Sequence, residues 1–248
     1  MFLIYFLVGL VCGFIDSALG MGYGVSSVTI LLSFGIAPAL ASASIHTAEG
    51  FVDIVSGVSH WKLGNIDKTL LLKLALPGII GAIFGAYALT LMSLSFAKPV
   101  VSTTLLIMGV LILIRFALKK DAIIKKMPSR LLSILGFVAA FVDVCGGGGW
   151  GPILTPTLIV NGHEPRKAVG TVELTEPIIS FTAVLVFGLL VGFETFLWQL
   201  VLPLIIGGFI LTPIAAYVTK KIPKKLFGIL IALWLIGLNL RTLLLSIL

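Results

Sequence analysis

Long apolar stretches recur from one end of the chain to the other, and short polar or glycine-rich breaks separate them. A helix needs about 20 apolar residues to cross a bilayer. The pattern predicts ten helical segments, at about 2–19, 24–35, 38–59, 69–94, 99–117, 130–145, 151–161, 165–190, 195–218 and 225–247. Segments 24–35 and 151–161 are too short to cross alone and each follows a glycine-rich break, so we interpret them as half-helices that either cross or turn back.

The composition sets the solvent in which these segments fold. Of 248 residues, 59% are hydrophobic and only 11% are charged, whereas soluble domains are about 25% charged. The chain is therefore expected to be an integral membrane protein without a separate soluble domain. The start of the chain, Met1–Ile4, lacks the basic residues of a signal peptide. Cys12 and Cys145 both lie in apolar surroundings and do not suggest a disulfide.

The second half of the sequence repeats the first. A shift of 127 positions aligns glycine, proline, aromatic and acidic residues in one register: Asp16 with Asp143, Gly20, Gly22 and Gly24 with Gly147, Gly149 and Gly151, Tyr23 with Trp150, Pro38 with Pro165, and Glu49 with Glu176. Chance matches of this kind are rarer than matches between leucines. The pattern predicts two repeats, 1–118 and 130–248, joined by a basic linker at 119–129.

Basic residues indicate how the repeats are oriented, because cytoplasmic loops are enriched in Lys and Arg. The basic loops are 60–68, 115–130, 161–167 and 219–225, and the equivalent loops of the opposite repeat carry few basic residues. Equivalent loops should therefore face opposite sides, which an odd number of crossings per repeat also requires. We predict an all-α polytopic protein of the cytoplasmic membrane with an inverted-topology tandem repeat and both termini outside.

The two glycine-rich breaks are the first candidate site. They read CGGGGWGP at 145–152 and LGMGYGV at 19–25. Glycine lets backbone N–H groups approach a ligand, Pro152 suits the first turn of a helix, and helix N-termini attract oxyanions. Candidate substrate-binding residues are those of the breaks and the hydroxyls and other side chains near them: Gly22, Tyr23, Gly24, Ser26, Ser44, Cys145, Gly148, Gly149, Trp150, Gly151, Thr155 and Thr171. The alternative is that these glycines only allow close helix packing.

A polar stripe marks the second candidate site. Six polar residues in segment 38–59 and just after it are spaced by 4, 3, 4, 3 and 4 positions, which puts them on one face of a helix: Ser42, His46, Glu49, Asp53, Ser56 and His60. In the second repeat the stripe comprises Glu173, Glu176 and Ser180, and Pro177 frees a backbone carbonyl one turn earlier. Ionisable groups this deep are costly and usually functional. We predict gating or proton coupling by His46, Glu49, Glu173 and Glu176; the alternative is hydrogen bonding between helices.

Two acidic residues stand just ahead of the breaks, Asp16 before the first and Asp143 before the second. Their position suits capping of the N–H groups in each break, so we expect Asp16 and Asp143, together with Pro152 and Pro177, to have structural roles. No Lys or Arg falls clearly within the centre of a span. An anion held at the breaks would then be bound by amides and hydroxyls.

The stretch GGGGWGPILTPTLIVNGHEPRKAVGTVELTEPIISFTAVLVFGLLVGF resembles the signature of the TauE/SafE family of sulfite exporters. It joins a glycine-rich break to the element Ala168–Thr171, whose weaker twin is Ala41–Ser44. The resemblance covers nearly the whole chain and implies a secondary transporter of small sulfur-containing anions, such as sulfite or organosulfonates, in a prokaryote. The first repeat departs from the pattern at Met21, Val25 and His46, which points to proton involvement.

Other functions fit the sequence less well or differently. Inverted repeats with broken helices are typical of secondary transporters, but a passive anion channel or a transporter of another small anion shares this architecture. An intramembrane aspartyl protease built on Asp16 and Asp143 would need a Gly-x-Gly-Asp pattern that both lack, so we do not expect an enzyme. The His and Glu residues show no recognised metal-ligand spacing, and no cofactor or nucleic-acid partner is predicted. The expected partners are the lipid bilayer and a small anion, with the oligomeric state left open.

Overall fold

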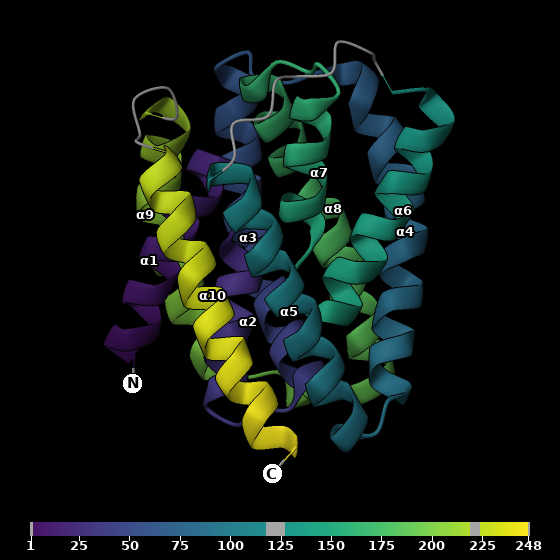
Figure 1. Ribbon diagram of the computed structural model, residues 1–248, viewed down its shortest axis with the longest axis vertical. Coiled ribbons are helices and arrows are strands. Elements are labelled where there is room, and N and C mark those ends of the chain that lie inside the picture. The colour runs from purple at the N-terminus through teal and green to yellow at the C-terminus, as the bar shows by residue number, and fades with distance from the viewer. Residues whose placement is uncertain (1, 118–126, 219–223, 248) are drawn as a thin grey trace.

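The computed structural model describes residues 2–117, 127–218 and 224–247. In this part of the chain the structure is a bundle of helices with one short 3-10 turn, η1 (Phe193–Thr195) (Figure 1). The helices are α1 (Phe2–Leu19), α2 (Tyr23–Ser33), α3 (Pro38–Lys62), α4 (Lys68–Leu91), α5 (Leu94–Ala117), α6 (Ser129–Gly146), α7 (Trp150–Val160), α8 (Pro165–Val191), α9 (Trp198–Val218) and α10 (Lys224–Ile247). The all-α fold predicted from the sequence is confirmed.

Most helix bounds lie within a few residues of the predicted segments, and α5 is the main exception. The sequence placed its start at Pro99, yet the helix begins at Leu94 and contains Pro99. Membrane helices tolerate proline because neighbouring groups satisfy the freed backbone carbonyl. The far end of α5 falls at Ala117 as predicted, and Arg115, which was also counted with the basic loop 115–130, lies in the last turn of the helix.

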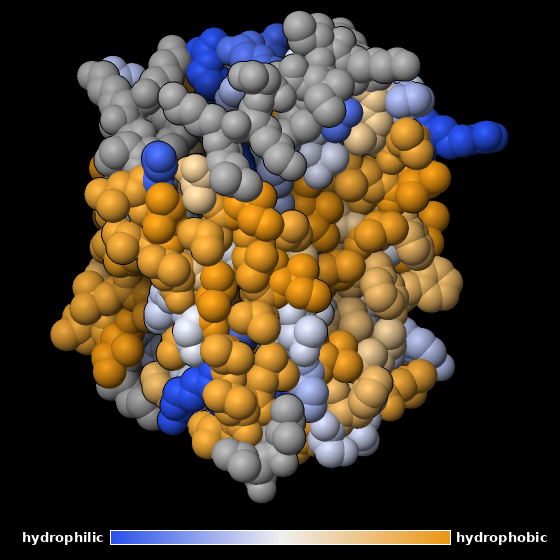
Figure 2. Space-filling model, viewed as in Figure 1, coloured by the Kyte–Doolittle hydropathy of each residue, from blue (hydrophilic) through white to orange (hydrophobic). Residues whose placement is uncertain are grey.

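The outer surface is suited to a bilayer. Among the described residues, six helices are long and apolar enough to cross a membrane: α1, α4, α5, α6, α8 and most of α9. Figure 2 shows a broad apolar region across the middle of one face of the bundle, and large side chains such as Leu72 and Leu189 are 62% and 82% exposed. The protein is therefore a multi-pass membrane protein.

Hydrogen bonds show which helix ends lie at the same end of the bundle. Asp67 N donates to Thr171 Oγ1 over 2.8 Å, which brings the loop after α3 to the start of α8. Lys73 Nζ donates to Ser129 Oγ over 2.8 Å, so the starts of α4 and α6 lie at this same end. At the opposite end, Leu197 N donates to Ser44 Oγ over 3.0 Å and joins the starts of α3 and α9.

The two half-helices turn back rather than cross. α2 and α7 have 11 residues each, which is roughly 16 Å of helix against a hydrocarbon core of about 30 Å. α2 runs back to the end of the bundle where α1 begins, and α7 returns to the end where α6 begins (Figure 1). Each predicted repeat would then hold four longer helices and one short helix that turns back.

The long helices pack in pairs. α1 packs along α9 and α6 packs along α4, whereas α3 pairs with α8 and α5 pairs with α10. If α1 corresponds to α6 and α4 to α9, each of these pairs is converted into another pair or into itself. The repeat boundaries, the inverted orientation and the cytoplasmic side remain predictions. Most of the linker 119–129 and of the loop 219–225 lies outside the described residues.

Candidate functional site

The two glycine-rich breaks lie against each other inside the bundle. A Cβ atom added to Gly148 would lie 2.5 Å from Val25 N, and one added to Gly151 would lie 2.6 Å from Gly20 O. Gly148 also has a φ of +142°, a backbone conformation that L side chains rarely adopt. Thr155 Oγ1 donates to Gly20 O over 2.7 Å and ties α7 to the first break. The glycines thus allow the starts of α2 and α7 to meet.

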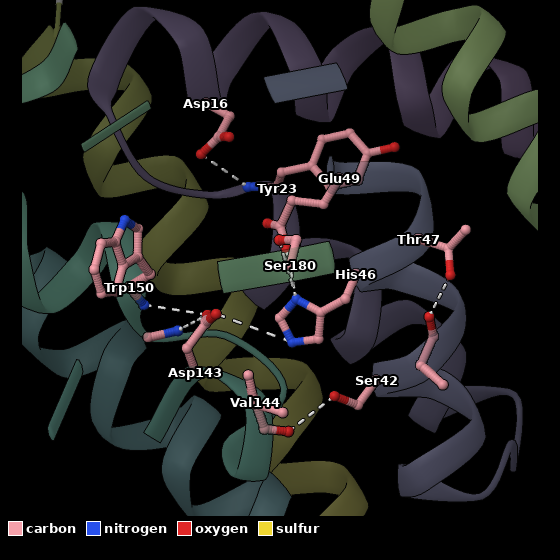
Figure 3. Close-up of polar contacts among 12 residues, drawn as sticks. Asp16, Tyr23, Ser42, His46, Thr47, Glu49, Asp143, Val144, Trp150 and Ser180 are labelled. Atoms are coloured by element: carbon pink, nitrogen blue, oxygen red, sulfur yellow. Dashed lines mark hydrogen bonds and ion pairs between the residues drawn. The ribbon is translucent and has the colours of Figure 1, made fainter. Parts of the chain in front are cut away.

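Each break is capped by the aspartate that precedes it. Asp143 Oδ1 accepts hydrogen bonds from Gly149 N and Trp150 N, at 2.8 and 3.1 Å. Asp16 Oδ1 accepts one from Tyr23 N at 3.2 Å (Figure 3). Negative charge is favourable at a helix N-terminus, so these carboxylates stabilise the starts of the half-helices. An external anion at the same ends would have to compete with them.

His46 on α3 lies at the centre of one polar group, which we call the imidazole cluster: His46, Glu49, Asp143 and Ser180. Its Nδ1 lies 3.1 Å from Glu49 Oε2 and 3.4 Å from Ser180 Oγ. On the other side of the ring, Nε2 lies 4.0 Å from Asp143 Oδ2 (Figure 3). The imidazole therefore links α3 and α8 to the capped start of α7 through α6.

A second polar group, the acidic cluster, contains Asp16, Asp53, Glu173 and Glu176. One oxygen from each of Asp16, Glu173 and Glu176 lies within 4.8 Å of the others, and Asp16, Asp53 and Glu49 form a similar group. Ser56 Oγ donates to Glu173 Oε2 over 2.5 Å. In the described part of the chain, no Lys or Arg forms an ion pair with these acids. The cluster therefore brings carboxylates together without an ion pair to Lys or Arg in the described residues.

Several predicted substrate-binding residues have structural partners instead. Ser44 and Thr171 accept hydrogen bonds from the backbone of Leu197 and Asp67, at opposite ends of the bundle. Tyr23 Oη donates to a backbone carbonyl of α9 over 3.4 Å, and Trp150 Nε1 donates to one of α8 over 3.3 Å. Both aromatic side chains are fully buried, so their role as substrate ligands stays a prediction.

The remaining predicted residues lie in or beside the breaks. Gly22 and Gly149 are the residues directly before α2 and α7. Gly24 lies close to Glu49, because a Cβ atom there would be 2.9 Å from Glu49 Oε1. Ser26 and Cys145 are buried in or beside a break. Pro152 lies inside α7, and Pro177 lies inside α8.

Sequence reasoning gave too little weight to two residues. Asp53 was not among the predicted gating residues, yet it is 0% exposed and lies with Asp16 and Glu49. Its spacing of four residues from Glu49 was the available signal. Arg115 was assigned to the linker, but its Nη1 lies 3.4 Å from Met21 Sδ in the first break. A linear pattern gives no signal for that contact, since the residues are far apart in sequence.

The polar centre is closed off from the surface. Asp16, Glu49, Asp53, Glu173 and Glu176 are at most 3% exposed. Burying ionisable side chains in a membrane protein costs free energy, and such residues usually mark a functional site. A solute would reach it only after helices move, as in alternating access. Fold and site together define a polytopic membrane transporter.

Comparison with known proteins agrees with this class. The chain matches the family model described as "Sulfite exporter TauE/SafE" over residues 5–242 and belongs to that family. It is 45% identical over 246 residues to "Probable membrane transporter protein YtnM" of Bacillus subtilis (strain 168), covering 97% of this chain and 82% of that protein. It is also 28% identical over 177 residues to "Probable membrane transporter protein YdhB" of the same organism, covering 69% and 71%. No solved structure matches the chain.

Proposed function

We propose that the protein transports a small sulfur-containing anion, such as sulfite or an organosulfonate, out across the cytoplasmic membrane, and that protons are coupled to this flux. The observation that carries the proposal is the meeting of two half-helix starts inside a sealed polar core. The substrate class is suggested by the family description, sulfite exporter.

The anion site would lie between the first break, near Gly22–Ser26, and the second, near Gly149–Pro152. Backbone N–H groups and the positive ends of α2 and α7 would face the anion there. Asp16 and Asp143 already accept hydrogen bonds from these ends, so the anion would bind against competition. A site of this kind binds weakly, which favours release on the other side.

The carboxylates around the site would act as the gate. Glu176 lies close to Asp16 on α1 and Glu173 on its own helix, while His46 faces Glu49 and Asp143. When these groups are negatively charged they would repel an anion, and when a cation neutralises them the anion would enter. Protonation of Glu49, Glu173, Glu176 and His46 is the neutralising step predicted from the sequence. It would couple the two fluxes during alternating access.

Flux measurements in proteoliposomes test this proposal. Uptake of ³⁵S-labelled sulfite is measured with and without an imposed pH gradient, with chloride as the control anion. The variant Glu176→Gln is expected to keep its fold and lose the pH dependence of transport. The control is Glu164→Gln, because Glu164 lies in an exposed loop with Arg166 as its partner. A pH dependence of flux that is unchanged in Glu176→Gln would contradict the coupling.

Binding identifies the substrate separately from coupling. Thermal unfolding of the purified protein is followed with sulfite, thiosulfate, sulfate and simple organosulfonates at two pH values, against chloride. Selective stabilisation by one sulfur oxyanion is expected. If none of them stabilises the protein and none is transported, the substrate class is wrong and the transporter carries another small anion.

A passive anion channel is the alternative class of transport protein that the sequence leaves open. A channel needs a continuous aqueous path, and burial of every carboxylate at the centre favours a carrier. The two are separated by rate and saturation. A carrier should show saturable flux at no more than about 10³ s⁻¹, whereas an open channel would give far faster, uncoupled conduction in planar bilayers.

A further inference from the structure

The acidic cluster has the geometry of a cation site. Single oxygens of Asp16, Glu173 and Glu176 all lie within 4.8 Å of one another. Hard cations bind oxygen at about 2.0–2.1 Å for Mg²⁺ and about 2.3–2.6 Å for Ca²⁺, so one ion placed between side-chain oxygens this close together could contact all three. The three residues come from α1 and α8 and are at most 3% exposed, so bulk water does not solvate their carboxylates.

Asp53 provides a second and independent indication of a ligand. Neither of its carboxylate oxygens has a hydrogen-bond partner, and the residue is 0% exposed. One of these oxygens lies within 4.8 Å of oxygens of Asp16 and Glu49. A buried charge is costly unless it is paired or coordinates a metal. Asp16 Oδ2, Glu173 Oε1 and Glu176 Oε2 are likewise without hydrogen-bond partners, and Asp16 belongs to both groups of oxygens.

The two predicted repeats differ at two positions of these polar clusters. Under the shift of 127 residues, Glu173 corresponds to His46, and Asp53 corresponds to Ser180. In the imidazole cluster, His46 lies 4.0 Å from Asp143 and can carry the neutralising charge itself. In the acidic cluster the same place is taken by another acid. One half of the polar core therefore has a histidine where the other has an additional acid.

We propose that the acidic cluster binds one hard metal cation, Na⁺ or Mg²⁺ in class, through oxygens of Asp16, Asp53, Glu173 and Glu176. Oxygen-only ligand sets select such ions over zinc or copper, which prefer nitrogen and sulfur. The hydroxyl of Ser56, 2.5 Å from Glu173 Oε2, supplies a neutral oxygen beside the site. Protons and the metal ion compete for the same oxygens. That the ion is cotransported rests on the proposed function, whereas its binding does not.

The test is cation binding to the purified full chain in detergent, without any anion substrate. N-methylglucamine chloride keeps the ionic strength constant while Na⁺ or Mg²⁺ replaces it, and thermal unfolding and calorimetric titration report binding. We expect one of these ions to raise the unfolding temperature saturably, with one ion per chain. Asp53→Asn should weaken the apparent affinity at least tenfold. It should melt no lower than the wild type in N-methylglucamine, since Asp53 accepts no hydrogen bond that the change would remove.

Two further variants make the result decisive. Glu173→Gln removes a second proposed ligand and should also weaken binding, whereas the exposed Glu164→Gln should respond like the wild type. The inference is wrong if the wild type shows no difference between Na⁺, Mg²⁺ and N-methylglucamine, or if Asp53→Asn and Glu164→Gln bind equally well. An unfolding temperature that rises only with falling pH would show that the cluster holds protons alone. Cation binding without sulfite flux would refute the proposed function and leave this site standing.

Discussion

His46 Nε2 lies 4.0 Å from Asp143 Oδ2, across the interface between α3 and α6. The same carboxylate caps the start of α7 through its other oxygen, which accepts from Gly149 N over 2.8 Å. A change in the charge of the imidazole would therefore be felt at the half-helix start. The contact joins the two candidate sites that the sequence treated separately, the polar stripe and the glycine-rich break.

Replacing His46 should lower the stability of the protein. His46→Gln removes the only base of the imidazole cluster and leaves Glu49 and Asp143 buried beside each other. Loss of one partner from a buried ion pair lowers the free energy of unfolding by about 3–5 kcal/mol. Thermal unfolding in detergent measures the loss. The double variant His46→Gln/Asp143→Asn should recover part of it, and a single variant as stable as the wild type would show that the pair is not charged.

Gly148 should tolerate no side chain. An alanine there would have an unfavourable φ of +142° and a Cβ atom 2.5 Å from Val25 N. The backbone strain alone costs about 1–3 kcal/mol, and separation of the two breaks should also reduce transport. Gly237→Ala is the matched control because a Cβ atom added to Gly237 would have no neighbouring atom within 4 Å. This helical position should gain about 0.5–1 kcal/mol; equal effects at both sites would contradict the close contact of the breaks.

Ser56 should matter more than its neighbour on the same helix. Ser56→Ala leaves Glu173 Oε2 without the donor that lies 2.5 Å away, and an unsatisfied buried acceptor costs about 1–3 kcal/mol. Ser59 donates only to Val55 O in its own helix, so Ser59→Ala should change stability by less than about 0.5 kcal/mol. Chemical or thermal unfolding of the two variants compares them. Indistinguishable stabilities would mean that Glu173 is satisfied in another way.

Asp67 should give a pH-dependent contribution outside the membrane. It caps α4 by accepting from Thr69 N and Thr69 Oγ1, at 2.9 and 2.6 Å. Partial burial alone would raise the pKa of Asp67, but these bonds and the nearby charge of Lys167 outweigh it and hold the pKa below its usual value. A depressed pKa in the folded state stabilises the protein above the unfolded pKa, near 3.9. The stabilisation is lost as the pH falls through the folded value.

Two variants of this cap separate its charge from its hydrogen bonds. Asp67→Ala should lower the free energy of unfolding by about 0.5–2 kcal/mol at neutral pH. The difference from the wild type should stay constant above about pH 5 and shrink below about pH 4. Asp67→Asn keeps an acceptor without a charge, so its stability relative to Asp67→Ala should not depend on pH. Unfolding curves at several pH values check both expectations.

The sequence by itself determined the class of fold and the position of most helices. Apolar stretches long enough to span a bilayer leave few alternatives to helices, because every backbone group must be satisfied within the membrane. The register of Asp16 with Asp143 and of Glu49 with Glu176 predicts a duplication. The polar stripe along α3 was also readable, since spacings of three and four residues fall on one helix face.

Only the tertiary structure decided which polar groups meet. It brought Gly148 against Val25, placed Asp53 with Asp16, and showed that α2 and α7 turn back. These contacts join residues from different repeats or distant helices, and helical periodicity describes only the face on which a residue lies. Hydropathy also gives no preference between a half-helix that crosses and one that returns. Packing of α1 on α9, of α4 on α6 and of α3 on α8 joins helices that are far apart in the sequence, and a linear pattern does not specify which helices become neighbours.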